Sequence, residues 1–184
     1  TQKALAAGFD RIICVGGDGT LNEIVNGFFD GADAINPAAS LAVLPSGVAA
    51  EFTRSLGIHR EAGALAIVNS PRIMAVDIGR ATFVRHDGKE GLSYFINCAH
   101  IGLGAAVAQR FNLPKAIGGY VSFTADLLQT LATYRNVPIA LEIDGHQFEE
   151  MCHDIVIANG RLMRRASGTA DRRVHGRGRI HPTG

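Results

Sequence analysis

Apolar and polar positions along the first 70 residues alternate between two kinds of segment. Residues 11–15 and 40–45 are short and almost wholly apolar, so both faces of each are expected to be buried, as in the inner strands of a parallel sheet. Glycine follows each run, and the residues after it have helical spacing. In the segment 20–29 the apolar residues recur at i, i+3, i+4 and i+7, which predicts a helix with one apolar face.

Further helices are expected at residues 1–8, 48–56 and 61–70, the first of them closed by Gly8. A strand, a glycine turn and a helix, repeated twice, are typical of a doubly wound α/β domain. The pattern therefore predicts an α/β domain with a parallel sheet over residues 1–71.

The pattern changes at Ser70-Pro71, after which the signals are those of hairpins. Asp87-Gly88 and Asp144-Gly145 are turn dipeptides between alternating segments. A mainly antiparallel second unit is therefore predicted over residues 72–160, interrupted by one long helix at 120–135. Its expected strands lie at 72–83, 93–104 and 153–160, and residues 139–150 are expected to form a hairpin around Asp144-Gly145.

In the last segment, residues 161–184, the apolar residues follow neither the helical nor the strand periodicity. It holds seven arginines and one acid, Asp171, which gives a local charge of +6 and leaves −5 on the residues before it, since the whole chain carries +1. An irregular basic tail is the expected structure. No aromatic residues lie between the arginines, which argues against a nucleic-acid-binding arm.

The overall composition indicates a globular protein but does not indicate a function. The 184 residues are 47% apolar, enough for a globular core, and a net charge of +1 gives no argument for a nucleic-acid partner. The cysteines are odd in number and lie in apolar runs, which favours reduced thiols of a cytosolic protein over disulfides or a metal site. No apolar run is long enough to span a bilayer. The chain begins at Thr1 in mid-pattern, so a missing N-terminal segment is expected.

The turn after the first apolar run is rich in glycine. Gly16, Gly17 and Gly19 are expected to allow positive φ angles and a close approach by a ligand. The following helix is expected to start near Thr20, with Thr20 as N-cap and Glu23 completing a capping box. Its N-terminal N–H groups would face the turn, where a phosphate would bind.

Asp18 lies among these glycines, where a carboxylate would repel a phosphate. The conflict is removed if a divalent cation or a hydroxyl proton lies between the two, so Asp18 is a candidate to bind Mg²⁺ or to accept a proton from an attacking alcohol. A purely structural interpretation has equal weight: Asp18 is then a turn or cap residue in a tight strand-to-helix corner.

Two stretches resemble a known family. VGGDGTLNEIVNG (15–27) resembles the nucleotide-binding signature of the diacylglycerol kinase catalytic domain, which diacylglycerol, sphingosine and ceramide kinases share. The same G-G-D-G-T occurs in NAD kinases, but LAVLPSGVAAEFTRSLGI (41–58) looks like the lipid-kinase pattern P-x-G-T-x-N-D-F-A-R-x-L-G-I. With softer matches as far as residue 161, the chain is similar to bacterial diacylglycerol kinases.

The resemblance implies an ATP-dependent lipid kinase that transfers the γ-phosphoryl group to the hydroxyl of diacylglycerol or a related lipid, with ATP and Mg²⁺ as cofactors. It implies an ATP-NAD kinase-like α/β nucleotide-binding domain followed by a β-sandwich-like second domain, with the active site in the cleft between them. Such a protein would be cytoplasmic and touch the inner membrane face to reach its lipid, without a nucleic-acid partner. The resemblance leaves homodimer formation open. An NAD kinase-like enzyme is an alternative.

The site residues follow by position from the family's motifs. Asp18 is implied as the catalytic and metal-binding residue. The nucleotide-binding residues implied are Gly16, Gly17, Gly19, Thr20, Glu23, Pro45, Ser46, Gly47 and Glu51.

The chain also departs from the family. Val48, Ala49, Ala50 and Glu51 stand where the pattern has Thr, Gly or Ala, Asn and Asp, so a hydroxyl and an amide are lost. The family's first strand and its glycine-rich continuation are absent, so truncation at both ends is expected, and an out-of-frame product is a further interpretation of residues 161–184. A degenerate, non-catalytic fragment is therefore a second alternative.

Other polar residues are weaker candidates. Asn97 and Asn159 are as well suited to satisfying backbone groups at strand ends as to lining the cleft. His100 lies in an apolar stretch and is expected to be packed and hydrogen-bonded rather than a catalytic base. The seven histidines have no metal-ligand spacing.

Overall fold

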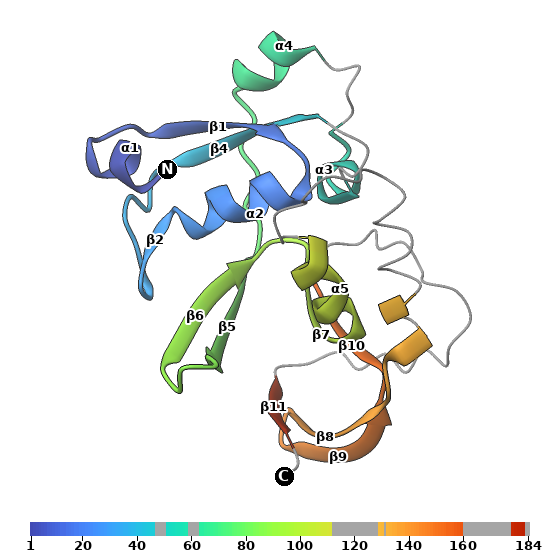
Figure 1. The fold of residues 1–184 in the computed structure, drawn as a ribbon. Coiled ribbons are helices and arrows are strands. Elements are labelled where there is room, and N and C mark those ends of the chain that lie inside the picture. Colours follow the sequence, from blue (N-terminus) through green and yellow to red (C-terminus); the bar gives the residue numbers. More distant parts are fainter. Residues whose placement is uncertain (47–50, 59–62, 112–128, 131, 160–177, 183–184) are drawn as a thin grey trace. The chain divides into compact units, whose positions relative to one another are not determined.

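A computed structural model describes residues 1–46, 51–58, 63–111, 129–130, 132–159 and 178–182 (Figure 1). Its internal contacts divide the chain into two units, Thr1–Cys98 with Ala158–Arg165, and Ala99–Ile157 with Ala166–Gly184. The domain limits at residues 71 and 160 stay a prediction.

The first unit is built on a parallel pair of strands, as predicted. Strand β1 (Arg11–Gly16) pairs with β4 (Ser40–Pro45) in parallel, in a register that sets the first residues and the last residues of the two strands opposite each other. Helix α1 (Gln2–Ala6) precedes β1, and Gly8 follows it with a φ of +91°. Helix α2 (Asp18–Asn26) follows β1 after one residue and packs against it.

Several short elements complete the α/β part. Strands β2 (Phe29–Asp30) and β3 (Asp33–Ala34) form an antiparallel hairpin, so the helix predicted over 20–29 ends three residues early. Helices α3 (Glu51–Ser55) and α4 (Ala64–Val68) lie within the helices predicted over 48–56 and 61–70. Residues 48–50 and 61–62 of those predictions lie outside the described residues.

An antiparallel hairpin follows, as the polar loop predicts. Strand β5 (Gly79–Val84) pairs with β6 (Glu90–Phe95). Asp87 and Gly88 lie in the turn, where Gly88 has a φ of +78° and the Asp87 carboxylate accepts the Lys89 N–H at 3.1 Å. Residues 72–78 do not form the first half of the expected strand.

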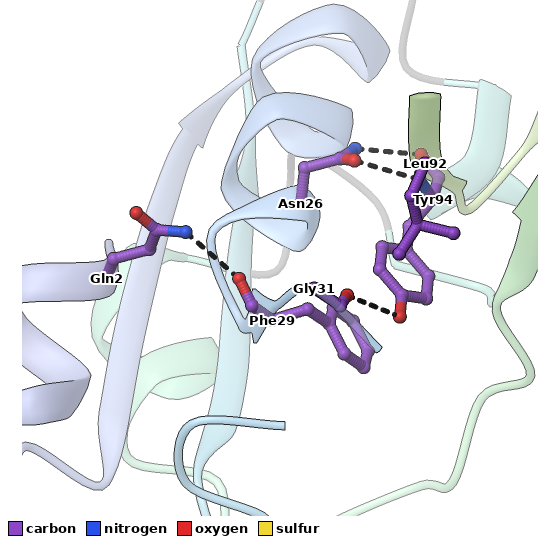
Figure 2. A pocket seen from close by; sticks show the side chains of 6 residues that line it. All are labelled: Gln2, Asn26, Phe29, Gly31, Leu92 and Tyr94. Carbon is purple, nitrogen blue, oxygen red and sulfur yellow. Dashed lines mark hydrogen bonds between the residues drawn. The ribbon is translucent and has the colours of Figure 1, made fainter. Parts of the chain in front are cut away.

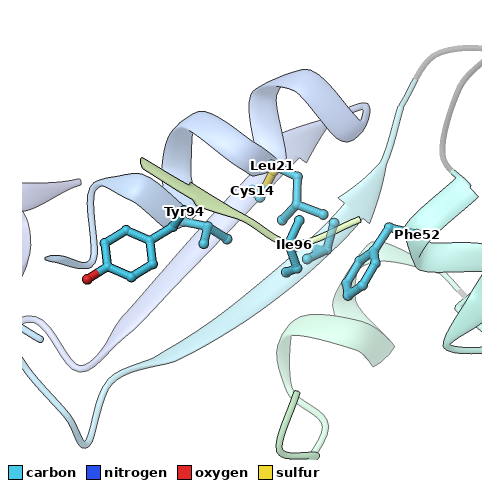
Figure 3. Close-up of a cluster of buried hydrophobic side chains, with 7 residues drawn as sticks. Cys14, Leu21, Phe52, Tyr94 and Ile96 are labelled. Atoms are coloured by element: carbon cyan, nitrogen blue, oxygen red, sulfur yellow. The ribbon is translucent and has the colours of Figure 1, made fainter. Parts of the chain in front are cut away.

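The hydrophobic core of this unit joins the hairpin to the α/β part (Figure 3). Side chains from β1, α2, β4 and α3 pack with Tyr94 of β6 and with Ile96 just after it. Phe29 also contributes, because its ring stacks on Tyr94 with a centroid separation of 3.8 Å. The buried members of the cluster are Cys14, Leu21, Val25, Val43, Phe52, Tyr94 and Ile96.

Strand β1 buries only one of its faces, so the expectation that both faces are buried is wrong. Cys14 is completely buried, whereas Ile13 and Val15 are 45% and 63% exposed, because β1 and β4 are the described strands of this sheet and the elements around them cover the Cys14 side. Burial raises the pKa of the Cys14 thiol above its ordinary value. All three cysteines are free, as expected, but Cys98 and Cys152 are only partly buried.

The second unit is mainly β, as predicted. Its elements are β7 (Cys98–Gly102), α5 (Leu103–Phe111), β8 (Val137–Ile143), β9 (His146–Cys152), β10 (Asp154–Ala158) and β11 (Gly178–Pro182). Strands β8 and β9 form an antiparallel hairpin whose turn residues, Asp144 and Gly145, have φ angles of +50° and +79°. Strand β7 neighbours β10, and β11 pairs with β8.

Three features of this unit differ from the predictions. The strand expected over 93–104 is two strands, β6 and β7, separated at Ile96-Asn97, and its end is the start of helix α5. Residues 178–182 form β11 within a tail expected to be irregular. Of the long helix predicted over 120–135, residues 129–130 and 132–133 are helical and most of the rest lies outside the described residues.

Candidate functional site

The predicted phosphate turn is the junction of β1 and α2. Gly16 ends the strand, and Gly17 is the N-cap of α2 with extended backbone angles, φ −95° and ψ −171°. Asp18 is thus the first helical residue, and Leu21 donates the first helix hydrogen bond to the Gly17 carbonyl at 3.0 Å. The capping box predicted for Thr20 and Glu23 is wrong, because the helix begins two residues before Thr20.

The positive φ angles expected for the glycines of this turn are not found. Of Gly16, Gly17 and Gly19, none has a positive φ. A Cβ on Gly16 would lie 2.7 Å from the Thr20 Cβ, so only glycine allows the first turn of α2 to fold back on the strand end. A Cβ on Gly19 would meet no atom of the described residues within 4 Å.

The half-buried Asp18 receives hydrogen bonds from two distant segments of the same unit. Its Oδ1 accepts the Phe52 backbone N–H of α3 at 3.4 Å, and its Oδ2 accepts an N–H of the Asn97 side chain at 3.2 Å. Because both oxygens accept hydrogen bonds, the plane of the carboxylate is fixed. Asp18 therefore presents an oriented carboxylate at the N-terminus of α2.

The second predicted loop lies beside the first. Pro45 pairs with Gly16 in the β1–β4 register, and the Ser46 N–H donates to the Gly16 carbonyl at 3.0 Å. Parallel strands bring their carboxyl ends to the same edge of the sheet, which is where α/β proteins bind ligands. The structure thus brings together the loops containing Gly16–Thr20 and Pro45–Ser46.

Three predicted site residues are not brought to Asp18 in the described structure. Gly47 lies outside the described residues, as does the side chain of Glu51, whose backbone begins α3. Glu23 is exposed on α2. It follows Asp18 by five residues, which places it about 7.5 Å further along the helix axis and on a different face.

Asn97 and Asn159 have different roles. Asn97 follows β6 and contacts Asp18. Asn159 satisfies backbone groups: its side chain donates to the carbonyls of Asp77 and Ile96, at 2.7 and 2.8 Å, and its N–H donates to the Asn97 carbonyl at 2.8 Å. The sequence could not identify the Phe52 N–H as a partner of Asp18, because every residue other than proline has a backbone N–H group.

A described cavity lies elsewhere in the first unit (Figure 2). It has a volume of about 190 Å³ and contains none of the predicted site residues. Tyr94 donates its hydroxyl to the Gly31 carbonyl at 3.1 Å, and Gln2 donates to the Phe29 carbonyl at 3.0 Å. These lining groups bond one another, so we assign the cavity a structural role. Its lining residues are Gln2, Asn26, Phe29, Gly31, Leu92 and Tyr94.

His100 is hydrogen-bonded, as expected, but it is exposed rather than packed. Its Nδ1 lies 3.1 Å from Asp154 Oδ2, and the other oxygen of Asp154 accepts the Gly104 N–H at 2.9 Å near the start of α5. Within the described ranges no cluster of three His, Cys, Asp or Glu side chains is placed to hold a metal ion.

Comparison with known proteins gives a family. Residues 1–81, which contain both loops, match the family model of the diacylglycerol kinase catalytic domain. Over 154 residues the chain is 31% identical to the "Diacylglycerol kinase" of Bacillus subtilis (strain 168), covering 80% of this chain and 46% of that protein. The chain is therefore similar to bacterial diacylglycerol kinases, and its first 81 residues match their catalytic domain.

Two further relatives give the same result. The "Probable lipid kinase YegS-like" of Pseudomonas aeruginosa (strain UCBPP-PA14) is 33% identical over 165 residues, covering 87% of this chain and 49% of that protein. A crystal structure of a diacylglycerol kinase from Bacillus anthracis (strain Sterne) has a TM-score of 0.58 at 23% identity, covering 88% of this chain and 50% of that one. That likeness supports the predicted fold class. The chain spans about half the length of the curated relatives it matches.

Proposed function

We propose that this chain belongs to the diacylglycerol kinase family and is part of an ATP-dependent kinase that phosphorylates a lipid hydroxyl, that of diacylglycerol or a related lipid. The observation that carries the proposal is the oriented carboxylate of Asp18 at the start of α2, in a turn that matches the family's catalytic domain. The relatives' names supply the acceptor class.

The phosphates of ATP would bind at the start of α2. The N–H groups of Gly19 and Thr20 precede the first intrahelical bond, so no carbonyl of α2 accepts them and they face the N-terminal end of the helix. Gly19 leaves the approach to that end open among the described residues. Pro45 and Ser46 lie beside the turn, and Gly47, Glu51 and Glu23 are included in the proposed site on the family's pattern alone.

The donor set at Asp18 fits Mg²⁺ bound together with a nucleotide. Mg²⁺ takes oxygen ligands and commonly uses one or two carboxylates plus substrate phosphates and water, so a single oriented carboxylate beside a phosphate site is sufficient. When bound, Mg²⁺ would neutralise the negative charge that develops on the transferred group. Asp18 would hold the ion, and the charge conflict between this carboxylate and a phosphate is thereby removed.

The reaction is an in-line transfer. The lipid hydroxyl oxygen forms a bond to the γ-phosphorus while the bond from that phosphorus to the oxygen shared with the β-phosphate breaks. ADP leaves with that oxygen, and the hydroxyl proton passes to a base. The chain's contribution is to place the phosphates at the helix start and to keep the Asp18 carboxylate in one orientation.

The lipid acceptor determines where in the cell the reaction takes place. A diacylglycerol remains in a bilayer, so we place the enzyme on the inner membrane face in peripheral contact, supplied with ATP from the cytoplasm. Among the described residues, no helix is long and apolar enough to cross a membrane.

Transfer of label from ATP tests the proposal. The purified full chain is incubated with γ-labelled ATP, Mg²⁺ and a panel of lipid alcohols in mixed micelles, with NAD as a polar acceptor in a separate reaction. We expect one lipid class to be labelled, and Asp18→Asn to lower its rate at least about 100-fold. Asp10→Asn, which changes an exposed carboxylate before β1, is the matched control and should keep the rate. Labelling of NAD alone, or full activity in Asp18→Asn, would contradict the proposal.

A nucleotide-binding chain without catalysis is the second candidate. Val48, Ala49 and Ala50 replace a hydroxyl and an amide of the family's second loop, and the chain spans about half the length of its relatives. Binding of Mg·ATP by the folded chain without transfer to any acceptor would select this candidate.

A further inference from the structure

Resting on the proposed function, we infer that Asn97 is a positioning residue for Asp18 and that the position serves the reaction at the expense of stability. The side chain reaches Asp18 across 79 residues of sequence: its Nδ2 lies 3.2 Å from Asp18 Oδ2. This is the bond that orients the second carboxylate oxygen, since Phe52 contacts the first.

The backbone around Asn97 is fixed by core packing of Ile96 and by hydrogen bonds from Asn159. Asn97 lies between β6 and β7, next to the core residue Ile96, which is 5% exposed. The Asn159 N–H donates to the Asn97 carbonyl at 2.8 Å, and the Asn159 side chain donates to the Ile96 carbonyl at 2.8 Å. The Asn97 amide is therefore presented to Asp18 from a fixed support.

The other polar atom of the Asn97 side chain is left without a partner. Its Oδ1 is buried and accepts no hydrogen bond within the described structure. Turning the amide over would not correct this, because the carbonyl oxygen would then face the carboxylate of Asp18 and repel it. A buried polar atom without a hydrogen bond lowers stability, so folding alone gives no reason for an asparagine here.

Asn26, in the same unit, shows how an asparagine with a structural role differs. Its Nδ2 donates to the carbonyls of Asn22 and Tyr94, and its Oδ1 accepts from Tyr94 N–H and Ser93 Oγ. Both polar atoms are thus used. At Asn97 one atom is used, and its partner is the carboxylate of the proposed catalytic site.

A double-mutant cycle tests the inference in the full chain. The variants are Asn97→Leu, Asp18→Asn and the two combined, with Asn97→Ala as a second truncation should Asn97→Leu fail to fold. Asn22→Leu, on α2 outside the site, is the matched control. Each variant is measured for kcat and KM with labelled ATP and lipid, for Mg·ATP affinity by calorimetry and for its thermal unfolding midpoint.

We expect the Asn97 variant to unfold at the same temperature as the parent chain or higher. Its kcat should fall about tenfold or more with the lipid KM unchanged, because Asp18 loses its orientation while lipid contacts remain. In the Asp18→Asn background the same change should cost little further, since its effect passes through that carboxylate. An unchanged kcat, a tenfold loss that persists in the Asp18→Asn background, or a lowered unfolding midpoint in both truncations would overturn the inference.

Failure of the proposed function gives a different result. If the parent chain transfers no label but binds Mg·ATP, the lipid kinase proposal fails and affinity decides the role of Asn97. A roughly tenfold weaker affinity in the Asn97 variant, absent in the Asp18→Asn background, would support positioning, and an unchanged affinity would overturn it. A folded parent chain that does not bind Mg·ATP would overturn both.

Discussion

Gly16 and Gly19 lie three residues apart and meet opposite physical requirements. A side chain on Gly16 would collide with Thr20, so this glycine is required by the fold of the turn. A Cβ on Gly19 would meet no described atom within 4 Å, and Gly19 has no positive φ, so neither packing against the described residues nor backbone strain requires glycine there. Glycine within a helix costs about 0.5–1 kcal/mol relative to alanine. Its presence at position 19 is explained if a phosphate approaches the backbone closely.

Gly19→Ala should separate stability from nucleotide binding. We expect the free energy of unfolding to rise by about 0.5–1 kcal/mol, because alanine is the better helix former. We expect Mg·ATP affinity to fall about tenfold or more, because the methyl group would occupy the approach to the helix start. Urea unfolding and calorimetric titration measure the two quantities. Unchanged affinity in the stabilised variant would place the phosphates elsewhere.

Asp18 was identifiable from the sequence and its partners were not. A carboxylate between glycines after an apolar run is a local pattern, and the family motif has a fixed spacing. The contact with Asn97 depends on a separation of 79 residues, and the contact with Phe52 uses a backbone N–H. Sequence could therefore nominate Asn97 only as one of two asparagines near strand ends.

Among the elements, α2 is hydrogen-bonded to β6 through the side chain of Asn26, in addition to its apolar packing with Tyr94. Asn26 donates to the Tyr94 carbonyl at 2.7 Å and accepts the Tyr94 N–H at 2.8 Å, so its amide pairs with the strand as another strand would (Figure 2). Since α2 begins at Asp18 and β6 leads to Asn97, the same attachment sets the spacing between these two residues of the candidate site.

Asn26→Leu should destabilise the unit by about 2–4 kcal/mol, because the N–H and the carbonyl of Tyr94 would each lose a partner, at about 1–3 kcal/mol per buried group. Asn22→Ala on the same helix is the control and should change stability by less than about 0.5 kcal/mol. Chemical unfolding followed by circular dichroism gives both values. A loss below 1 kcal/mol in Asn26→Leu would mean that water replaces the lost bonds.

Element type was predictable where the pattern was local. The parallel β1–β4 pair, the β5–β6 hairpin and the Asp144-Gly145 turn follow from apolar runs and turn dipeptides. Helix boundaries were less predictable. Gly17 has the extended backbone of an N-cap, so α2 begins at Asp18 and not near Thr20. The break at Ile96-Asn97 was hidden because Ile96 is apolar and buried like the strand residues around it.

At the scale of the whole molecule, the number of strands in a sheet is a property that no single segment encodes. An apolar run such as 11–15 indicates that both faces of the strand are buried in a complete sheet. It does not indicate which elements cover those faces. In the described structure Ile13 and Val15 are largely exposed on β1. In the same way, no hydrophobic periodicity predicted β11. Its five residues lie in a segment rich in arginine and glycine and pair with β8.

The charge distribution along the whole chain gives the last prediction. Residues 161–184 carry +6 on a chain whose net charge is +1, and a basic residue near an anionic bilayer contributes about 1 kcal/mol. The full chain should therefore bind vesicles containing phosphatidylglycerol, and much less those of phosphatidylcholine alone. Vesicle cosedimentation at rising salt measures this, and affinity should fall steeply as the charges are screened.

A matched variant assigns that binding to the arginines. Replacing Arg164, Arg165, Arg172 and Arg173 by glutamine removes four of the seven positive charges and leaves β11 intact. We expect at least tenfold weaker binding to the anionic vesicles, with kinase activity on lipid in neutral micelles unchanged because the phosphate turn is untouched. If the variant binds as tightly as the parent chain, or if salt has no effect, membrane contact depends on apolar surface instead. The exposed side chains of β5, Phe83 and Val84, would then be the next to test.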